Sequence, residues 1–531
     1  MTPNIADIIR HHVSLEVRCL DRLYLQAYLP KLQTSGGLCY FLHDHLGYPI
    51  PSPALFKPLH DRFVTAVDRF VAAHGLPVEH FEPRQRKDDV VAAYRTRFTA
   101  REGVVVVGVA QEKMRSFKAH KRPGPAVSFD FSRQSVAVNH YYFYVQDREW
   151  GPAFLKIGTY LPYPVKICLN GHEWVKQQLR RARLSFESLD NGFLACAAPE
   201  RLQALCDRLA PTDVQAFFDR WSQRLPWPLT TADRAAGYGH RLAINQLEAS
   251  LTQVFDRPVQ GRHFFEAVIR ENLDLGRPDR VGLLFPLRIT RTTPPPAYGY
   301  RSRVLTEGVE PSLHVEYKSS HVKQYFKEQR ALRTETTINN PNDFYIRKGV
   351  DNLTHLRDLG QGVNRKLLEV ERLSHHCVLT QEALDRLQRP TVETGQHVSA
   401  LRFGDPRVMA LCQAISGFAH LPRGFRNRDL RPQVEALLGR PYSSAQMTYD
   451  LRRLRLKGLI HRLPGTHRYT ATTYGLKVAF FYSKLYLRIL RPSWPALLPA
   501  DDALPRSLRD ALEHLDTEIR KLHEEAALAA A

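Results

Sequence analysis

The 531-residue sequence contains no uninterrupted apolar run long enough to cross a bilayer, and no apolar core followed by a small-residue cleavage site over residues 1–22. Its seven cysteines are odd in number and include no C-x-x-C pair. Walker-type G-x-x-x-x-G-K, zinc-finger, G-x-S-x-G and dinucleotide-binding motifs are also missing. These absences remove the corresponding enzyme classes and predict a cytoplasmic protein without a membrane partner, whose cysteines are buried and reduced.

The charge of the chain is strongly positive, with 75 Lys and Arg against 54 Asp and Glu and a net charge of +21. A length of 531 residues exceeds what one ordinary core supports, and 43% hydrophobic and 24% charged residues are typical of globular domains. We expect an α+β multidomain protein with a mixed or antiparallel sheet body. The expected divisions are a mainly helical region at 1–100, a sheet domain at 101–225, a second α+β region at 226–400, a winged helix at 401–490 and a helical tail at 491–531. Within them, helices are expected over 5–13, 15–29 and 59–74, a charged run at 84–89 should open another helix, and the turn at 170–174 should lead into one more.

Residues 443–469 form the stretch whose order points to a specific ligand. Apolar residues recur at helical spacing over 447–459, and cationic residues occupy the other face. The segment 459–470 predicts two short strands joined by a tight turn. Two further helices are expected upstream, over 406–418 and 427–438. The predicted order is therefore helix, helix, helix, hairpin.

This order resembles the winged helix-turn-helix domains of bacterial transcription regulators and replication proteins, over about 401–490. In those domains the third helix enters the major groove and the hairpin contacts the flanking backbone. The segment carries 16 Lys and Arg against 4 Asp and Glu, so +12 of the net charge lies within it. The charge predicts salt-dependent binding of nucleic acid, either DNA or structured RNA. The alternative is a winged helix that only dimerises or docks on protein.

A second informative stretch covers residues 311–340. Alternation and β-rich composition predict two or three adjacent strands there, carrying several cationic side chains. Together with the third helix and hairpin of the C-terminal region, these strands supply the candidate nucleic-acid-binding residues. The full set is Gln446, Tyr449, Arg452, Arg453, Arg455, Lys457, Arg462, His467, Arg468, Lys318, Lys323 and Arg333.

An aromatic residue and a lysine followed by an R-x-E strand is similar to a pattern in replication initiators of rolling-circle plasmids and filamentous phages. The resemblance implies Tyr325 as a nucleophile and Glu335 as a metal ligand or base, with Lys327 beside them. His314 and Glu316 would stand in for the metal histidines, and Mg²⁺ or Mn²⁺ is expected only if the chain is a nuclease. The alternative is a solvated strand pair with cross-strand Lys–Glu and Arg–Glu partners.

At least five strands are expected between 103 and 170, and the aromatic run Tyr141–Tyr144 lies on one of them. Outward-facing rings near Lys156 and Lys166 could stack single-stranded bases, whereas inward-facing rings would fill the core. Residues 111–121 are expected to be helical.

Two other metal hypotheses use different residues. His43-Asp44-His45 has the spacing of an HUH nickase motif but lacks the alternation of a strand, so a loop or surface pair is the expected reading. Asp130, Asp147 and Asp190 could be assigned an RNase-H-like role, although no spacing singles them out.

The phrases NGHEW, RALRTETTIN and QMTYDLRRLRLKGLI look like those of a widespread group of uncharacterised bacterial proteins, which implies no activity. An apolar stripe over 504–530 predicts a helix that could form a homodimer or fold back on the winged helix. The leading hypothesis is a nucleic-acid-binding protein, and a mobile or replicating element is its expected context. Its alternatives are a metal-dependent nickase or nuclease and an RNA-binding ribonucleoprotein component.

Overall fold

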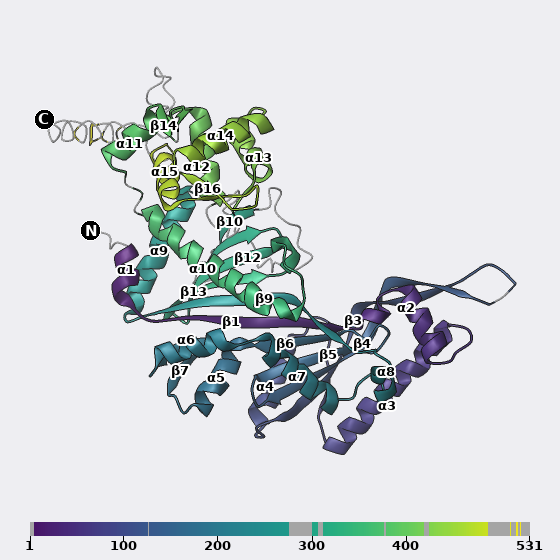
Figure 1. Cartoon of the computed structure of the whole chain (residues 1–531). Coiled ribbons are helices and arrows are strands. Elements are labelled where there is room, and N and C mark those ends of the chain that lie inside the picture. Colours follow the sequence, from purple (N-terminus) through teal and green to yellow (C-terminus); the bar gives the residue numbers. More distant parts are fainter. Residues whose placement is uncertain are drawn as a thin grey trace.

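A computed structural model describes residues 5–125, 127–275, 300–305, 312–375, 377, 379–393, 395–418 and 424–486, with isolated positions 510, 514, 517, 518 and 521. Its centre is an eleven-stranded sheet in the order β10-β11-β12-β13-β9-β1-β6-β5-β4-β3-β2 (Figure 1). All neighbours in this sheet are antiparallel except β2 and β3. The strands are β1 (Val13–Tyr28), β2 (Val78–His80), β3 (Gly103–Lys121), β4 (Phe129–Asp147), β5 (Gly151–Gly158), β6 (Val165–Asn170), β9 (Arg241–Phe255), β10 (Tyr300–Leu305), β11 (Ser312–Tyr317), β12 (Ser320–Lys327) and β13 (Ala331–Ile338).

The helices of the sheet body are α1 (Ile5–His12), α2 (Ser35–Tyr40), α3 (Phe56–His74), α4 (Lys87–Arg97), α5 (Gly171–Arg181), α6 (Pro199–Arg208), α7 (Pro211–Arg224), α8 (Thr231–Ala235), α9 (Pro258–Leu275) and α10 (Leu353–His375). Figure 1 shows α10 above β9 and β13, and α5, α6 and α7 below β1 and β6. A small hairpin, β7 (Phe186–Leu189) with β8 (Gly192–Cys196), lies between α5 and α6 in the chain. The largest core cluster joins β1, β4, β5, β6 and β9 to α3, α5 and α7.

The α+β class is confirmed, but the sheet does not follow the expected divisions. Strands from 1–100, 101–225 and 226–400 all join the same sheet, so the boundaries near 100 and 225 do not divide it. The expected helices α1, α3 and α4 are present. Asn170 caps α5 by accepting a hydrogen bond from the Glu173 backbone N–H, so NGHEW begins a helix as predicted.

Two helices expected from the sequence are strands. Residues 15–28 of the expected helix belong to β1, because apolar side chains alternate there with polar ones, Leu15 and Val17 being buried and Glu16 exposed. Residues 111–121 continue β3 to Lys121, where β4 supplies a backbone partner for every residue after Val106. Tertiary pairing therefore overrides the cationic pattern that suggested a helix.

The C-terminal unit has the predicted order of elements. Helices α12 (Pro406–Phe418), α13 (Asn427–Leu438) and α14 (Ser444–Leu456) precede a hairpin of β16 (Ile460–Arg462) and β17 (Tyr469–Ala471). The unit also contains α11 (Gln381–Gln388), the hairpin β14 (Thr391–Glu393) with β15 (Gln396–Val398), and α15 (Thr473–Leu485). Its core includes Val370 of α10, which joins it to the sheet body. The expected dimerisation helix over 504–530 lies almost entirely outside the described residues.

All seven cysteines are free thiols, and Cys19, Cys206, Cys377 and Cys412 are buried. Within the described part of the chain, no helix combines the length and apolarity that a membrane span requires.

Candidate functional site

An irregularity in β1 places an acidic residue at the middle of the sheet. The pairing of β1 with β9 runs from Leu20↔Ala249 directly to Leu23↔Leu247, so Asp21 and Arg22 together oppose the single residue Glu248. This two-against-one arrangement is a β-bulge, a feature that re-aims side chains and occurs often beside active sites.

The bulge brings together three carboxylates from three adjacent strands. Asp21 lies on β1, Glu248 on β9 and Glu335 on β13, and one oxygen from each lies within 4.8 Å of the others. Glu248 pairs with Thr337 across β13, and Glu335 pairs with Ser250, so the two glutamates are diagonal neighbours on one face of the sheet. Carboxylate oxygens are the ligands that Mg²⁺ and Mn²⁺ prefer.

Arg333 lies beside these carboxylates and is buried, with 1% of its surface exposed. One guanidinium nitrogen forms an ion pair with Asp21, and Nε lies 3.4 Å from Oε2 of Glu335. Arg333 also donates to the Asn191 carbonyl at 2.6 Å and to Nε2 of His172 at 3.1 Å. Because a guanidinium has only donors, Nε2 of His172 is an acceptor and the ring proton is on Nδ1.

The surroundings of the three carboxyl groups shift their pKa values in different directions. Burial raises the pKa of Glu248 to about 8, and the neighbouring Glu335 and Asp21 add to this increase. Burial, followed by the charge of Asp21, also raises the pKa of Glu335. Burial alone would raise the pKa of Asp21, but the charge of Arg333, together with a hydrogen bond from Asn191, lowers it below its ordinary value. At neutral pH, Glu248 therefore retains a proton that a bound cation would displace.

Four of the sequence-predicted residues meet on β12 and β13. Tyr325 lies opposite Arg333, and Lys323 lies opposite Glu335. The Tyr325 hydroxyl donates to Oε2 of Glu335 at 3.4 Å, and Nζ of Lys323 is 4.3 Å from the Tyr325 ring centre. Burial, followed by the charge of Glu335, raises the pKa of Tyr325, which disfavours the phenolate that a nucleophile needs.

The remaining predicted catalytic and metal residues are not part of this group. Lys327 is 3.2 Å from Glu328 and 4.0 Å from Asp190. His314 contacts the Ser312 hydroxyl at 3.0 Å. Neither His314 nor Glu316 belongs to the acidic cluster found among the described residues. The proposed His–Glu metal pair is therefore not assembled with Glu335, because β11 is separated from β13 by β12.

The alternative metal residues have structural partners instead. His45 lies on a π-helical turn and contacts Asp233 at 2.7 Å. Asp130 pairs with Arg122. Asp147 is buried and accepts hydrogen bonds from Arg220 and Trp221. These are separate sites, so neither the HUH nor the RNase-H-like grouping forms.

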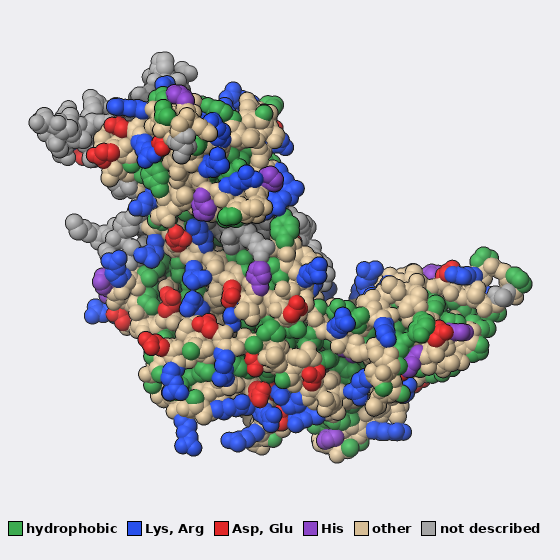
Figure 2. All heavy atoms as spheres, in the orientation of Figure 1, with side chains coloured by type: hydrophobic (Ala, Val, Ile, Leu, Met, Phe, Trp, Pro, Cys, Tyr) green, Lys and Arg blue, Asp and Glu red, His purple; other side chains and the backbone are tan. Residues whose placement is uncertain are grey.

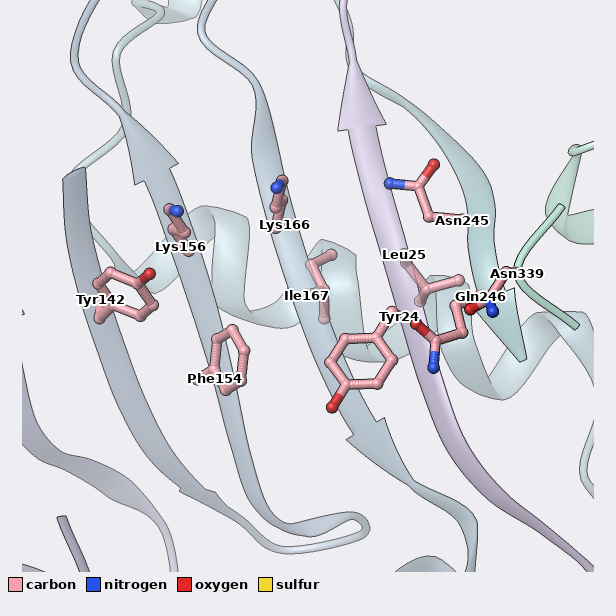
Figure 3. Close-up of a pocket in the computed structure, with 10 residues that line it drawn as sticks. All are labelled: Tyr24, Leu25, Tyr142, Phe154, Lys156, Lys166, Ile167, Asn245, Gln246 and Asn339. Atoms are coloured by element: carbon pink, nitrogen blue, oxygen red, sulfur yellow. The ribbon is translucent and has the colours of Figure 1, made fainter. Parts of the chain in front are cut away.

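A pocket of about 320 Å³ lies on the sheet (Figure 3). Its lining comes from β1, β4, β5, β6, β9 and the residue after β13, namely Tyr24, Leu25, Tyr142, Phe154, Lys156, Lys166, Ile167, Asn245, Gln246 and Asn339. The Gln246 side chain donates to Glu248 at 2.7 Å and so connects the pocket to the cluster. The Tyr141–Tyr144 rings alternate between two core clusters, and all four are buried, so they do not form an exposed stacking surface.

The second candidate surface is on α14 and its hairpin. Ser443 caps α14 with a reciprocal capping box, which fixes where the helix begins. The only acid in the helix, Asp450, is buried and pairs with Arg407 at 2.6 Å. The outward face therefore presents no carboxylate from α14. The predicted residues that are exposed there are Gln446, Tyr449, Arg452 and Arg455 of α14 and Arg462 and His467 of the hairpin.

Three residues predicted to contact nucleic acid are buried, which corrects their assignment. Arg453 pairs with Asp450 at 3.3 Å, Lys457 donates to the carbonyls of Arg386 and Arg389, and Arg468 donates to the Gly424 carbonyl. Each of these side chains has at least one partner inside the protein and is too buried to reach an external phosphate. Arg333 is buried in the same way within the acidic cluster.

The chain matches no protein-family model, no curated protein sequence and no solved structure.

Sequence reasoning found Glu335 but missed Asp21 and Glu248. Residues 21, 248 and 335 are far apart in the chain, and only the strand order β13-β9-β1 brings them together. One local signal was present, since Asp21 is an acid at a buried position in phase with Leu15, Val17 and Cys19. Correct assignment of residues 13–28 as a strand would have made that buried acid visible.

Proposed function

We propose that the protein binds nucleic acid, with duplex DNA as the preferred ligand, through the exposed face of α14 and the following hairpin. The observation that carries the proposal is the sorting of charge on α14. Its acid is turned inward, whereas Arg452 and Arg455 are exposed together with Tyr449. Figure 2 shows Lys and Arg side chains on the part of the upper unit where Figure 1 places α13 and α14.

The element order supports a winged-helix mode of binding, in which α14 would enter the major groove and the β16–β17 hairpin would contact the backbone. Arg452 and Arg455 are three residues apart and so lie on neighbouring positions of one helical face. Arg462 and His467 would extend the contact along the hairpin, where the Arg462 guanidinium is 3.1 Å from His467. Each cation that neutralises a phosphate releases condensed counterions.

The double variant Arg452→Ala/Arg455→Ala tests the proposal. We expect the affinity for a short DNA duplex to fall by about tenfold or more, and the slope of log K against log salt to fall by about two. Fluorescence anisotropy over a series of NaCl concentrations measures both quantities. Unchanged affinity and slope would overturn the proposal.

Arg453→Ala is the matched control within the same helix. Its guanidinium is buried against Asp450, so the substitution should lower the unfolding temperature and leave the salt slope unchanged. Arg86→Ala removes a well-exposed arginine in front of α4 and should change neither quantity.

A second candidate function is divalent-metal-dependent cleavage of phosphodiesters, which the clustering of Asp21, Glu248 and Glu335 favours. The three carboxylates fit Mg²⁺ or Mn²⁺, and such an ion would supply a Lewis acid and an activated water. Arg333 already neutralises Asp21, so the carboxyl with an exchangeable proton is Glu248. Binding should therefore strengthen as the pH rises toward 8.

Calorimetric titration with MnCl₂ at pH 7 tests the metal site directly. We expect saturable binding accompanied by release of about one proton, and loss of both in Glu248→Gln. Glu371→Gln is the control, because Glu371 is also buried with a raised pKa but lies outside the cluster. Binding that survives Glu248→Gln would place the ion elsewhere. Incubation of labelled DNA with Mn²⁺ then tests whether the protein cleaves it. The variant Tyr325→Phe tests whether formation of a covalent protein–DNA adduct depends on the Tyr325 hydroxyl.

A further inference from the structure

Tyr345 lies in an exposed and strained position between the sheet body and the C-terminal unit. It follows the short 3₁₀ turn Pro341–Phe344, and 59% of its surface is exposed. Its backbone is left-handed, with φ of 60° and ψ of 29°. A bulky residue rarely adopts this conformation, and such strain tends to accumulate at functional positions.

Three cations from separate segments surround the Tyr345 ring. Nζ of Lys318, from the β11–β12 turn, is 5.4 Å from the ring centre. The guanidinium carbons of Arg426, before α13, and Arg468, in the β16–β17 hairpin, are 5.7 and 5.9 Å away. The three cations therefore lie around one electron-rich ring.

The charge around this ring is predominantly positive. Arg428, on the first turn of α13, adds a fourth cation to the group. Although partial burial raises the pKa of Tyr345, these four cations, Lys318 foremost, lower it below its ordinary value. Two carboxylates belong to the same region. Asp343 accepts from Ser319, and Asp429 accepts from the Arg426 backbone N–H and lies 3.9 Å from Arg428.

We propose that Lys318, Arg426 and Arg428 form, around Tyr345, a binding site for a phosphodiester group of a nucleic-acid strand. The buried Arg468, bonded to the Gly424 carbonyl, adds positive charge without contacting the ligand. Guanidinium groups match phosphate oxygens in bidentate geometry, and an ammonium group adds a mobile point charge. The exposed ring gives an adjacent base a surface on which to stack. The assignment of the phosphate to nucleic acid rests on the function proposed above.

The site lies where the sheet body and the C-terminal unit meet, so it extends the proposed nucleic-acid-binding surface beyond α14. Lys318 lies on the turn between β11 and β12 of the eleven-stranded sheet, whereas Arg426, Arg428 and Arg468 belong to the C-terminal unit. The isolated pairing of Phe425 with Tyr469 holds the segment before α13 against the hairpin, so these three arginines share one local framework. A strand bound at Tyr345 therefore contacts both parts of the molecule, beyond the face of α14.

The full-length double variant Lys318→Ala/Arg428→Ala tests the site with two probes, inorganic pyrophosphate and a short DNA strand. Neither residue lies in the α14 face, and Arg428 is well exposed, so the fold should persist. We expect the affinity for each probe to fall by about tenfold, and the salt slope for DNA to fall by about two. Arg86→Ala should leave both affinities unchanged.

Tyr345→Gly separates a binding role from a structural one. Glycine accepts the left-handed conformation without strain, so the unfolding temperature should stay the same or rise while DNA affinity falls. A fall in both would assign Tyr345 a structural role and overturn its part in the site.

The two proposals fail in distinguishable ways. If pyrophosphate binds and Lys318→Ala/Arg428→Ala abolishes that binding, but DNA does not bind, the phosphate site stands and its assignment to nucleic acid falls. If Arg452→Ala/Arg455→Ala weakens DNA binding, while Lys318→Ala/Arg428→Ala retains wild-type affinity for both probes, the site at Tyr345 is overturned.

Discussion

Glu371 is a buried carboxyl group on α10, facing β12 and β13. Its Oε2 accepts a hydrogen bond from Gln324 at 3.1 Å, and its Oε1 has no partner. Burial raises its pKa to about 8. Glu248 has a similarly raised pKa in the acidic cluster. At neutral pH, both groups are therefore protonated in the folded state and ionised in the unfolded state.

This difference determines whether the free energy of unfolding rises or falls with pH. The unfolded state loses its proton near pH 4 and the folded state only near pH 8, so the free energy of unfolding should fall as pH rises between these values. Glu371→Gln should flatten this fall and stabilise the protein at pH 8 by about 2 kcal/mol. Urea denaturation at pH 5.5 and 8 measures the effect. The exposed Glu187→Gln provides the control, and a variant no more stable than the wild type at pH 8 would contradict the expectation.

At the scale of elements, α10 packs closely on β9 through a glycine. A Cβ added at Gly360 would lie 2.7 Å from Cβ of Ala249, whereas a Cβ at Gly362 would meet nothing within 4 Å. The two glycines are therefore matched positions in one helix with opposite environments.

Substitution of each glycine by alanine should have opposite effects on stability. Gly360→Ala should lower the free energy of unfolding by about 1–3 kcal/mol, because α10 must move away from β9. Gly362→Ala should raise it by about 0.5–1 kcal/mol through helix propensity alone. Thermal denaturation of the two variants measures both changes in stability. If Gly360→Ala instead stabilised the protein, α10 would have to be free to shift away from β9.

Local patterns predicted several elements correctly. Helices α3, α12, α13 and α14 and the β16–β17 hairpin follow from apolar periodicity and turn residues that lie within each segment. β1 could not be recognised in this way, because its mixed charges also suit a surface helix and its partners begin at residues 165 and 241. The exposed side of α14 was also only partly predictable, since Asp450 draws Arg453 inward.

The residues of the acidic site also differ in whether nearby sequence is enough to predict them. Tyr325, Arg333 and Glu335 were predicted together because a cross-strand pair over a short turn is a local arrangement. Asp21 and Glu248 joined them only through the order of strands in the sheet and the bulge in β1. Neither the strand order nor the bulge can be predicted from any short segment of the sequence.

At the scale of the whole molecule, α10 contributes side chains to successive core clusters. Leu353 and Leu356 belong to the main sheet core, Leu367 and Leu368 to the cluster beside α9, and Val370 to the C-terminal core. A single helix is therefore shared by the sheet body and the C-terminal unit.

This sharing predicts cooperative unfolding. A calorimetric scan should show one transition for both units, because loss of α10 removes part of each core. Leu367→Ala should shift the whole transition to lower temperature by creating a cavity next to α9. Two resolved transitions, of which Leu367→Ala moves only one, would show that the units unfold independently.

The central position of β1 also affects how the chain is made. The strand leaves the ribosome first among those of the sheet, yet its partner β9 is completed at Phe255, about 240 residues later. At about 5–20 residues per second, translation leaves this hydrophobic strand without a neighbour on that side for about 12–50 s. An unpaired strand edge is a template for aggregation. The nascent protein should therefore need a chaperone to shelter its N-terminal segment until the middle of the sheet can close.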